Sequence, residues 1–293
     1  MFRSLGFAML GLLVVRSAIA AGGDDDGGRK LRDVAYADAA STRLNVDAPA
    51  EGDRHPIVVW VHGGAWRFGD KDFVQEQPKA FTKRGYVWVG VGYRFVPEVT
   101  YKEQAGDVAR AVRWARDHAK EFGGDPDRIF LMGHSAGAHL AALTATDERY
   151  LKAAGLDLDA LSGVILLDGA GYDVPRQIRE SVLPRIRSLY TGVFGDDPKV
   201  QEDASPIQHV AGDKGIAPFL ILHVGRLDSR TQSNALAARL REAGVEATVA
   251  AFPSKTHMTI NRELGRPGDR PTQVVFDFLE ARCNPEPAAA RAE

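Results

Sequence analysis

The most constraining feature of this sequence is the pentapeptide Gly133-His134-Ser135-Ala136-Gly137, which has the form G-x-S-x-G. An apolar run at 128–132 precedes it and predicts a buried strand, and an alanine-rich run at 138–146 follows it and predicts a helix. Between a strand and a helix, the two glycines permit a sharp turn that lifts the serine hydroxyl clear of the sheet edge. The pattern therefore predicts a nucleophile elbow centred on Ser135.

The remainder of the chain alternates between strand and helix patterns around this turn. Short apolar runs predict buried strands, and longer amphipathic segments predict helices between them. This alternation predicts an α/β fold, a mostly parallel central sheet with helices on both faces. The predicted core strands cover 57–61, 85–91, 128–132, 164–167, 219–224 and 245–252, and the predicted helices cover 75–83, 103–120, 138–146, 232–243 and 273–281.

Length and charge limit the classes of function that the chain can serve. The 293 residues favour one α/β domain over two, and weakly alternating residues at 31–46 predict edge strands that open it. A net charge of −2 provides no electrostatic footprint for a nucleic acid or an anionic membrane. Cys283 is the single cysteine, so an intrachain disulfide is excluded.

The N-terminus has the character of a secretory signal. Arg3 precedes an apolar run at 5–15, and Ala18-Ile19-Ala20 provides a small-residue cleavage site. Because the run is shorter than the roughly 20 residues of a membrane span, we expect no stable span after processing. The predicted organisation is a signal peptide at 1–20, a flexible linker at 21–30, a single hydrolase-like domain at 31–284 and a disordered tail at 285–293. Such a protein would be exported, to a periplasm or out of the cell.

A second motif follows the predicted strand at 57–61. There, His62-Gly63-Gly64-Ala65-Trp66 places a glycine pair at the carboxyl end of a core strand. Backbone N–H groups at such a turn can face a cavity and bind negative charge that develops on a carbonyl oxygen. Ala136, directly after the serine, is the usual source of another such N–H group.

A serine needs a base to accept its proton and a carboxylate to orient that base. Three histidines follow the predicted helix at 138–146, and only His257 lies in a loop after the last predicted strand, whereas His209 and His223 do not. Asp228 follows a sheet strand at its carboxyl end, where the functional groups of such sheets gather. The sequence therefore predicts a Ser135, His257 and Asp228 triad. Asp168 also ends a strand and is the alternative acid.

The segment at 172–210 has a looser pattern, with several prolines and short helical pieces, and predicts a lid-like insertion over the site. Its apolar side chains could line a substrate pocket or form the insertion's own small core. These residues are Ile178, Val182, Leu183, Ile186, Leu189, Tyr190 and Phe194.

Four motifs in order, HGGAW at 62–66, GHSAGAHLAAL at 133–143, GRLD at 225–228 and the histidine loop at 254–258, resemble the α/β-hydrolase superfamily. The resemblance is to its serine carboxylesterase branch, which includes feruloyl-esterase-like, hormone-sensitive-lipase-like and arylformamidase-like enzymes. It implies that Ser135 is the nucleophile, that His257 is the base, and that Asp228 orients it, since the usual acid lies one strand later than Asp168. It also implies that the N–H groups of Gly63, Gly64 and Ala136 form the oxyanion hole.

Two departures narrow the resemblance. Ala65 replaces the third glycine of the HGGG loop, and little sequence lies between the predicted linker and the first core strand, whereas hormone-sensitive-lipase-like enzymes usually carry a sizeable N-terminal helical cap. Both departures favour the feruloyl-esterase-like and arylformamidase-like groups.

The resulting hypothesis is an exported serine hydrolase that cleaves small to medium carboxylic esters and needs no metal or cofactor. An arylformamidase-type amide hydrolase is the alternative, and a non-catalytic binding protein on the same fold is a third reading.

Overall fold

The computed structural model describes residues 27–284 and contains an eight-stranded sheet in the order β1-β2-β4-β3-β5-β6-β7-β8. β2 pairs antiparallel with β1 and β4, and every other neighbouring pair is parallel. The predicted mostly parallel sheet with helices on both faces is therefore confirmed. The strands are β1 Arg29–Ala35, β2 Arg43–Ala48, β3 His55–Val61, β4 Val87–Val91, β5 Gly124–His134, β6 Gly163–Leu167, β7 Phe219–His223 and β8 Ala247–Ala251. β1 begins inside the segment predicted as a linker.

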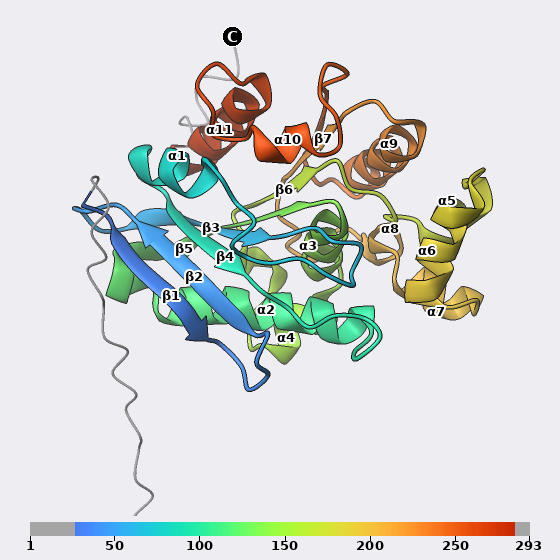
Figure 1. Ribbon diagram of the computed structural model, residues 1–293, viewed down its shortest axis with the longest axis horizontal. Helices are drawn as coiled ribbons and strands as arrows, with labels where there is room; N and C mark the ends of the chain where they lie inside the picture. Colours follow the sequence, from blue (N-terminus) through green and yellow to red (C-terminus); the bar gives the residue numbers. More distant parts are fainter. Residues whose placement is uncertain (1–26, 285–293) are drawn as a thin grey trace, which may run out of the picture.

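Helices cover both faces of this sheet (Figure 1). They are α1 Gln77–Lys83, α2 Tyr101–Asp117, α3 Ala136–Thr146, α4 Glu148–Ala153, α5 Val174–Glu180, α6 Pro184–Phe194, α7 Pro198–Asp203, α8 Pro206–His209, α9 Leu227–Glu242, α10 Thr259–Arg262 and α11 Arg270–Cys283, with short 3-10 turns at Ala119–Phe122 and Leu158–Ala160. The helices at 148–153 and 259–262 were not predicted from the sequence. No helix in residues 27–284 combines the length and apolar character needed to cross a bilayer.

The core strands are apolar without interruption because both of their faces are buried. In β3, Ile57, Val59 and Val61 point into a core shared with α2, α3 and α9. Val58 and Trp60 point into a second core, to which α1, α10 and α11 contribute. The period of two along one strand thus fills two separate cores.

Local sequence explains where α2 begins. Its first turn is closed by a capping box, in which the Thr100 hydroxyl and the Glu103 carboxylate satisfy backbone N–H groups reciprocally. Helix α2 accordingly begins at Tyr101, ahead of the predicted start at Glu103.

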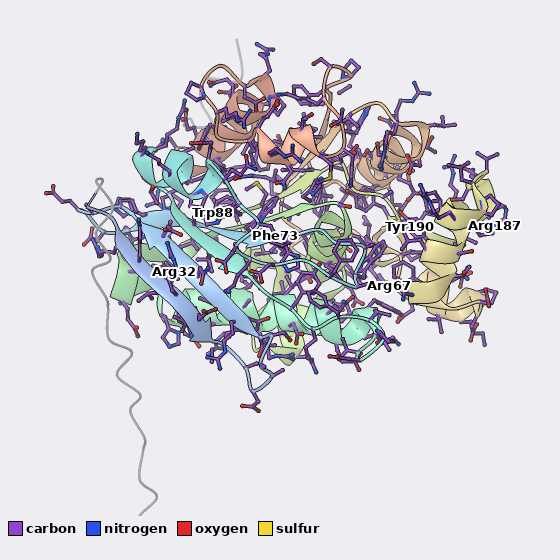
Figure 2. The ribbon with its side chains drawn as sticks, in the orientation of Figure 1. Arg32, Arg67, Phe73, Trp88, Arg187 and Tyr190 are labelled. Carbon is purple, nitrogen blue, oxygen red and sulfur yellow. The ribbon has the colours of Figure 1, made fainter. Side chains whose placement is uncertain are left out.

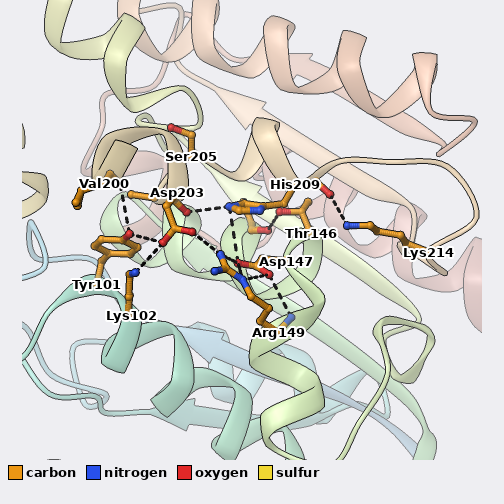
Figure 3. Close-up of polar contacts among 12 residues, drawn as sticks. Tyr101, Lys102, Thr146, Asp147, Arg149, Val200, Asp203, Ser205, His209 and Lys214 are labelled. Atoms are coloured by element: carbon orange, nitrogen blue, oxygen red, sulfur yellow. Dashed lines mark hydrogen bonds and ion pairs between the residues drawn. The ribbon is translucent and has the colours of Figure 1, made fainter. Parts of the chain in front are cut away.

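Helices α5 to α8 occupy the segment predicted as an insertion, and α5, α6 and α7 lie together at one end of the molecule (Figure 1). Asp203, at the end of α7, joins this segment to the main domain (Figure 3). Its carboxylate accepts hydrogen bonds from Tyr101 (2.8 Å) and Arg149 (2.6 Å) and forms an ion pair with Lys102 (3.0 Å). These contacts fix α7 and α8 against α2 and α4.

Close backbone contact fixes α3 against the sheet. A Cβ atom at Gly137 would lie 2.1 Å from the carbonyl oxygen of Val61 and 2.4 Å from that of His62. A Cβ atom at Gly133 would lie 2.3 Å from the carbonyl oxygen of Gly137. Only glycine fits at these two positions, so the end of β5, the start of α3 and the end of β3 lie in direct backbone contact.

We predict opposite effects for two Gly→Ala substitutions in helices. Gly137→Ala should lower the free energy of unfolding by more than about 2 kcal/mol, because the new methyl group has no space. Gly106→Ala, in α2, should raise it by about 0.5–1 kcal/mol, because the nearest atom to its Cβ would be the Arg110 side chain at 3.5 Å. Urea unfolding measures both, and equal effects would contradict this account of the α3 contact.

Candidate active site

Ser135 stands between β5 and α3 with φ of +57°. Non-glycine residues rarely adopt such a conformation, and here backbone contacts on both sides of Ser135 stabilise it. The Ser135 N–H donates to the carbonyl of Leu167 at the end of β6 (3.0 Å), and the Gly137 contact holds the following helix. The side chain is therefore presented at the carboxyl edge of the sheet, at the N-terminus of a helix.

His257 joins Ser135 to a buried carboxylate. Its Nε2 lies 3.0 Å from Ser135 Oγ, and its Nδ1 lies 2.6 Å from Asp168 Oδ2. Because the carboxylate accepts a hydrogen bond from the Nδ1–H group, the proton of the neutral imidazole stays on Nδ1. Nε2 then directs a lone pair toward the serine hydroxyl. The fold thus brings the predicted serine and histidine, which are 122 residues apart in the sequence, into hydrogen-bonding contact.

The predicted partnership of Asp228 with His257 is wrong. Helix α9 begins at Leu227, before the predicted start at Gln232, and this places Asp228 in its first turn. The Asp228 side chain is 37% exposed and lies 3.4 Å from Arg226 Nε. Asp168, the alternative acid, occupies the position instead, because it directly ends β6, the strand beside β5.

The surroundings of Asp168 keep its side chain ionised. Burial raises the pKa of this fully buried carboxyl, but the hydrogen bond with His257, the nearby Arg226 guanidinium (3.7 Å) and the Val224 N–H (3.1 Å) outweigh burial and lower the pKa to about 2. A carboxylate that stays charged at neutral pH can hold an imidazole in one tautomer and stabilise the imidazolium.

Gly63, Gly64 and Ala136 are the residues predicted to form the oxyanion hole. All three line the same cavity as Ser135, and a Cβ at Gly63 would lie 3.0 Å from the Ser135 Cβ. In residues 27–284, their N–H groups have no acceptor within hydrogen-bonding distance. Gly64 has φ of +128°, which a side chain would rarely adopt. Free N–H groups beside a serine hydroxyl can bind a developing oxyanion.

Two histidines close to Ser135 in the sequence, His134 and His139, stabilise the loops of the site through hydrogen bonds. His134 Nε2 donates to the carbonyl oxygen of His257 (2.8 Å), which fixes the loop that carries the imidazole. His139 Nδ1 accepts from the Trp66 indole (3.2 Å), and its Nε2 donates to the carbonyl of Ala204 (2.8 Å). The glycine loop is thereby tied to α3 and to the insertion. The sequence did not predict the Trp66–His139 contact, although Trp66 belongs to the HGGAW motif at 62–66 and His139 to the GHSAGAHLAAL motif at 133–143.

His62 supports the glycine loop from below. Its ring stacks on Tyr93 with centroids 4.4 Å apart, and the Tyr93 hydroxyl donates to the His62 carbonyl (2.9 Å). Its Nδ1 lies 2.6 Å from the Gly63 carbonyl, as expected for a residue that shapes the loop through hydrogen bonds.

A cavity of about 700 Å³ opens above Ser135. One part of its wall is polar, with Gln75, Asn261, Arg226 and Arg262. Apolar residues also line it, and Figure 2 labels two of them, Phe73 and Tyr190. Its apolar residues are Phe68, Phe73, Ile186, Leu189, Tyr190 and Met258.

The apolar residues of the insertion divide between the two roles considered for them. Ile186, Leu189 and Tyr190 line the cavity, Phe194 and Ile178 pack with the core without lining it, and Tyr190 and Ile186 do both. Val182 and Leu183 are exposed, at 90% and 61%.

Known proteins resemble this chain in sequence and in fold. A family model described as BD-FAE matches residues 44–164. Esterase LipQ of Mycobacterium tuberculosis is 33% identical over 78% of this chain and 56% of its own length. The chain belongs to the α/β-hydrolase carboxylesterase family. Within this family, a probable isoprenylcysteine alpha-carbonyl methylesterase of Arabidopsis thaliana is 28% identical over 77% of this chain and 50% of its own length. The chain thus spans about half the length of these curated relatives.

Solved structures agree with this carboxylesterase fold. Esterase B of Lactobacillus rhamnosis, solved with a bound inhibitor, superimposes with a TM-score of 0.73 at 20% identity, over 90% of each chain. A thermophilic esterase of Thermogutta terrifontis superimposes with a TM-score of 0.67 at 24% identity, over 87% of this chain and 94% of its own. At these identities the superpositions establish the fold.

Three histidines around the site generate a pH prediction. Burial lowers the pKa of His62 and His139 to about 4 and that of His134 to about 3. The unfolded chain therefore binds more protons than the folded one between pH 6.5 and these values, so stability is complete above pH 6.5 and falls as the pH decreases. Each imidazole should contribute a slope of up to about 1.4 kcal/mol per pH unit in that window.

Urea unfolding from pH 7 down to pH 4.5 measures this slope. In His139→Asn one fewer proton is taken up on unfolding, so the slope of the unfolding free energy against pH should be smaller by up to about 1.4 kcal/mol per pH unit. This holds even though the variant is less stable overall. Parallel curves for the two proteins would show that His139 does not carry the effect.

Proposed function

We propose that this chain is a serine carboxylesterase that cleaves small to medium carboxylic esters through an acyl-enzyme on Ser135. The observation that carries the proposal is the bridge that His257 makes between Ser135 Oγ (3.0 Å) and the Asp168 carboxylate (2.6 Å). The names of relatives support it, since these are an esterase and a probable carboxylic ester hydrolase.

In the first half of the reaction, Ser135 Oγ attacks the carbonyl carbon of the ester while His257 Nε2 takes the hydroxyl proton. Asp168 stabilises the imidazolium that forms. The carbonyl oxygen becomes negatively charged and accepts hydrogen bonds from the N–H groups of Gly63, Gly64 and Ala136. When the tetrahedral intermediate collapses, the bond to the alcohol oxygen breaks, and His257 gives that oxygen its proton.

In the second half, water replaces the alcohol. His257 takes a proton from the water as its oxygen attacks the acyl carbon, and the same N–H groups hold the new oxyanion. Collapse of this intermediate releases the carboxylic acid and returns the proton to Ser135 Oγ. The starting arrangement is thereby restored, and the protein supplies every proton transfer from its own side chains.

The cavity suggests which esters fit. Its volume of about 700 Å³ accommodates a medium-sized ligand. Phe68, Phe73 and Met258 line it although they are 63%, 72% and 53% exposed, so an apolar acyl or alkyl group would cover side chains that water now contacts. We therefore favour esters with at least one apolar group of moderate size.

We further propose that the protein is exported. The support is the signal-like order of residues at 1–20, which lie outside the part of the chain that the structure describes.

The first experiment is hydrolysis of p-nitrophenyl esters from acetate to laurate by the protein and its Ser135→Ala variant. We expect turnover of the shorter esters and a loss of about four or more orders of magnitude in kcat for the variant. Ser188→Ala, on the exposed face of α6, is the matched control and should retain full activity. Equal rates for Ser135→Ala and the control would favour a non-catalytic binding role, and faster hydrolysis of N-formyl aryl amides than of esters would favour an arylformamidase.

The two aspartates provide the second experiment. Asp168→Asn should lower kcat by about three to four orders of magnitude, because the amide no longer holds the required tautomer of His257. Asp228→Asn should change kcat by only a few fold, because Asp228 contacts Arg226 and not His257. Thermal unfolding of each variant verifies that it is folded, and the reverse order of effects would assign the acid to Asp228.

A further inference from the structure

A second cavity lies beside the catalytic one. It has a volume of about 750 Å³ and is formed by β1, β2, β4 and α1. Asp72, Val74 and Gln75 contribute to the walls of both cavities. Figure 2 labels Arg32 and Trp88, which line the second cavity, and Phe73, which lines the catalytic one. The segment at 72–75 therefore separates two adjoining cavities.

The second cavity is strongly basic. Six basic residues line it, Arg29, Lys30, Arg32, Lys71, Lys79 and Lys83. Within residues 27–284, the acidic residues of the wall are Asp47 and Asp72. The chain as a whole has a net charge of −2, so this excess of positive charge is a local property of the cavity.

The two acidic residues are already matched by neighbours. Arg32 Nη2 lies 2.6 Å from Asp47 Oδ1, and Lys71 Nζ lies 3.1 Å from Asp72 Oδ2. Lys71 is also 2.7 Å from Asp33. These ion pairs form a fixed frame on the sheet side of the cavity, and the proposal below depends on two other basic residues, Lys79 and Lys83.

Lys79 and Lys83 supply the excess from the α1 side. They lie four residues apart at exposed positions of α1, an arrangement in which like charges repel. In residues 27–284, neither side chain forms an ion pair or hydrogen bond. An anion between them would replace repulsion with attraction to both ammonium groups.

The remaining wall indicates the chemistry of the ligand. Asn45, Gln75 and Thr82 offer hydrogen-bonding groups, whereas the aromatic residue of the wall, Trp88, is 1% exposed and presents no ring face for stacking. The volume exceeds what a single phosphate or carboxylate would fill. The cavity thus suits an extended polar ligand that carries several negative charges.

We propose that this cavity is a subsite for the acidic part of the ester substrate, a hydrophilic chain with several carboxylate or phosphate groups. The part of this proposal that concerns catalysis rests on the proposed esterase function, because the adjoining cavity contains Ser135. Binding of the acidic part depends only on the basic cavity and can be measured separately.

Binding is tested by calorimetry on the full chain with Ser135→Ala, which cannot turn substrate over. The probes are hexagalacturonate for carboxylates, inositol hexakisphosphate for phosphates and maltohexaose as a neutral chain. We expect one equivalent of an anionic probe to bind, more weakly as salt increases, and maltohexaose not to bind. Which anionic probe binds more tightly identifies the acidic group.

The deciding variant is Lys79→Gln/Lys83→Gln, which removes the unpaired charges and keeps residues that favour a helix. It should weaken anionic binding by about tenfold or more. Lys120→Gln/Lys199→Gln removes the same charge from exposed positions outside both cavities and should leave binding within about twofold. Failure of both anionic probes to bind, or equal losses in the two variants, would overturn the subsite.

A competing occupant to test is the acidic run Asp24, Asp25 and Asp26, which comes shortly before the wall residue Gly28 in the sequence. Replacing all three with asparagine tests whether they occupy it. Binding that appears only after this replacement would overturn a substrate subsite, because the cavity would then serve the chain's own aspartates.

Catalysis is tested with acetylated hexagalacturonate and acetylated maltohexaose. We expect the acidic ester to have the higher kcat/KM, and Lys79→Gln/Lys83→Gln to remove this advantage through KM while p-nitrophenyl acetate turnover stays unchanged. Equal kcat/KM for the two acetylated chains would overturn the subsite. If the protein without any substitution does not hydrolyse p-nitrophenyl acetate, that result refutes the esterase proposal instead.

Discussion

The close backbone contact at Gly137 is the constraint on which the rest of the site depends. Because no side chain separates α3 from the end of β3, the chain between β5 and α3 must turn within one residue, and that residue is Ser135 with its φ of +57°. The same contact brings the glycine loop after β3 against the serine, as the short Gly63 to Ser135 approach shows. One steric requirement thus positions both the hydroxyl and the free N–H groups around it.

Side-chain hydrogen bonds then fix the loops and the insertion, which the pairing of the strands does not hold in place. His134 holds the loop of His257, and His139 connects Trp66 to the insertion through the Ala204 carbonyl. Asp203 in turn holds that insertion to the main domain. The buried imidazoles remain neutral near pH 7 because burial lowers their pKa, so they act as fixed donors and acceptors.

The two adjoining cavities differ in the chemistry of their walls. The catalytic cavity exposes apolar side chains, whereas its neighbour concentrates basic ones, and the segment at 72–75 belongs to both. A ligand that spans them would present an apolar or neutral ester to Ser135 and an acidic portion to Lys79 and Lys83. The net charge of the whole sequence is near zero and does not indicate a basic cavity. The basic residues come together only in the fold, from β1, Lys71 and α1.

The sequence by itself determined the strands, the elbow and the glycine loop, because buried parallel strands and tight turns leave strong local patterns of apolar residues and glycine. It also singled out Ser135 and His257, which the structure brings into contact. Only the tertiary structure decided between Asp168 and Asp228, since both aspartates follow strands and both have the required chemistry. The choice depended on where α9 begins and on which strand neighbours β5, and neither is encoded in the residues next to either aspartate.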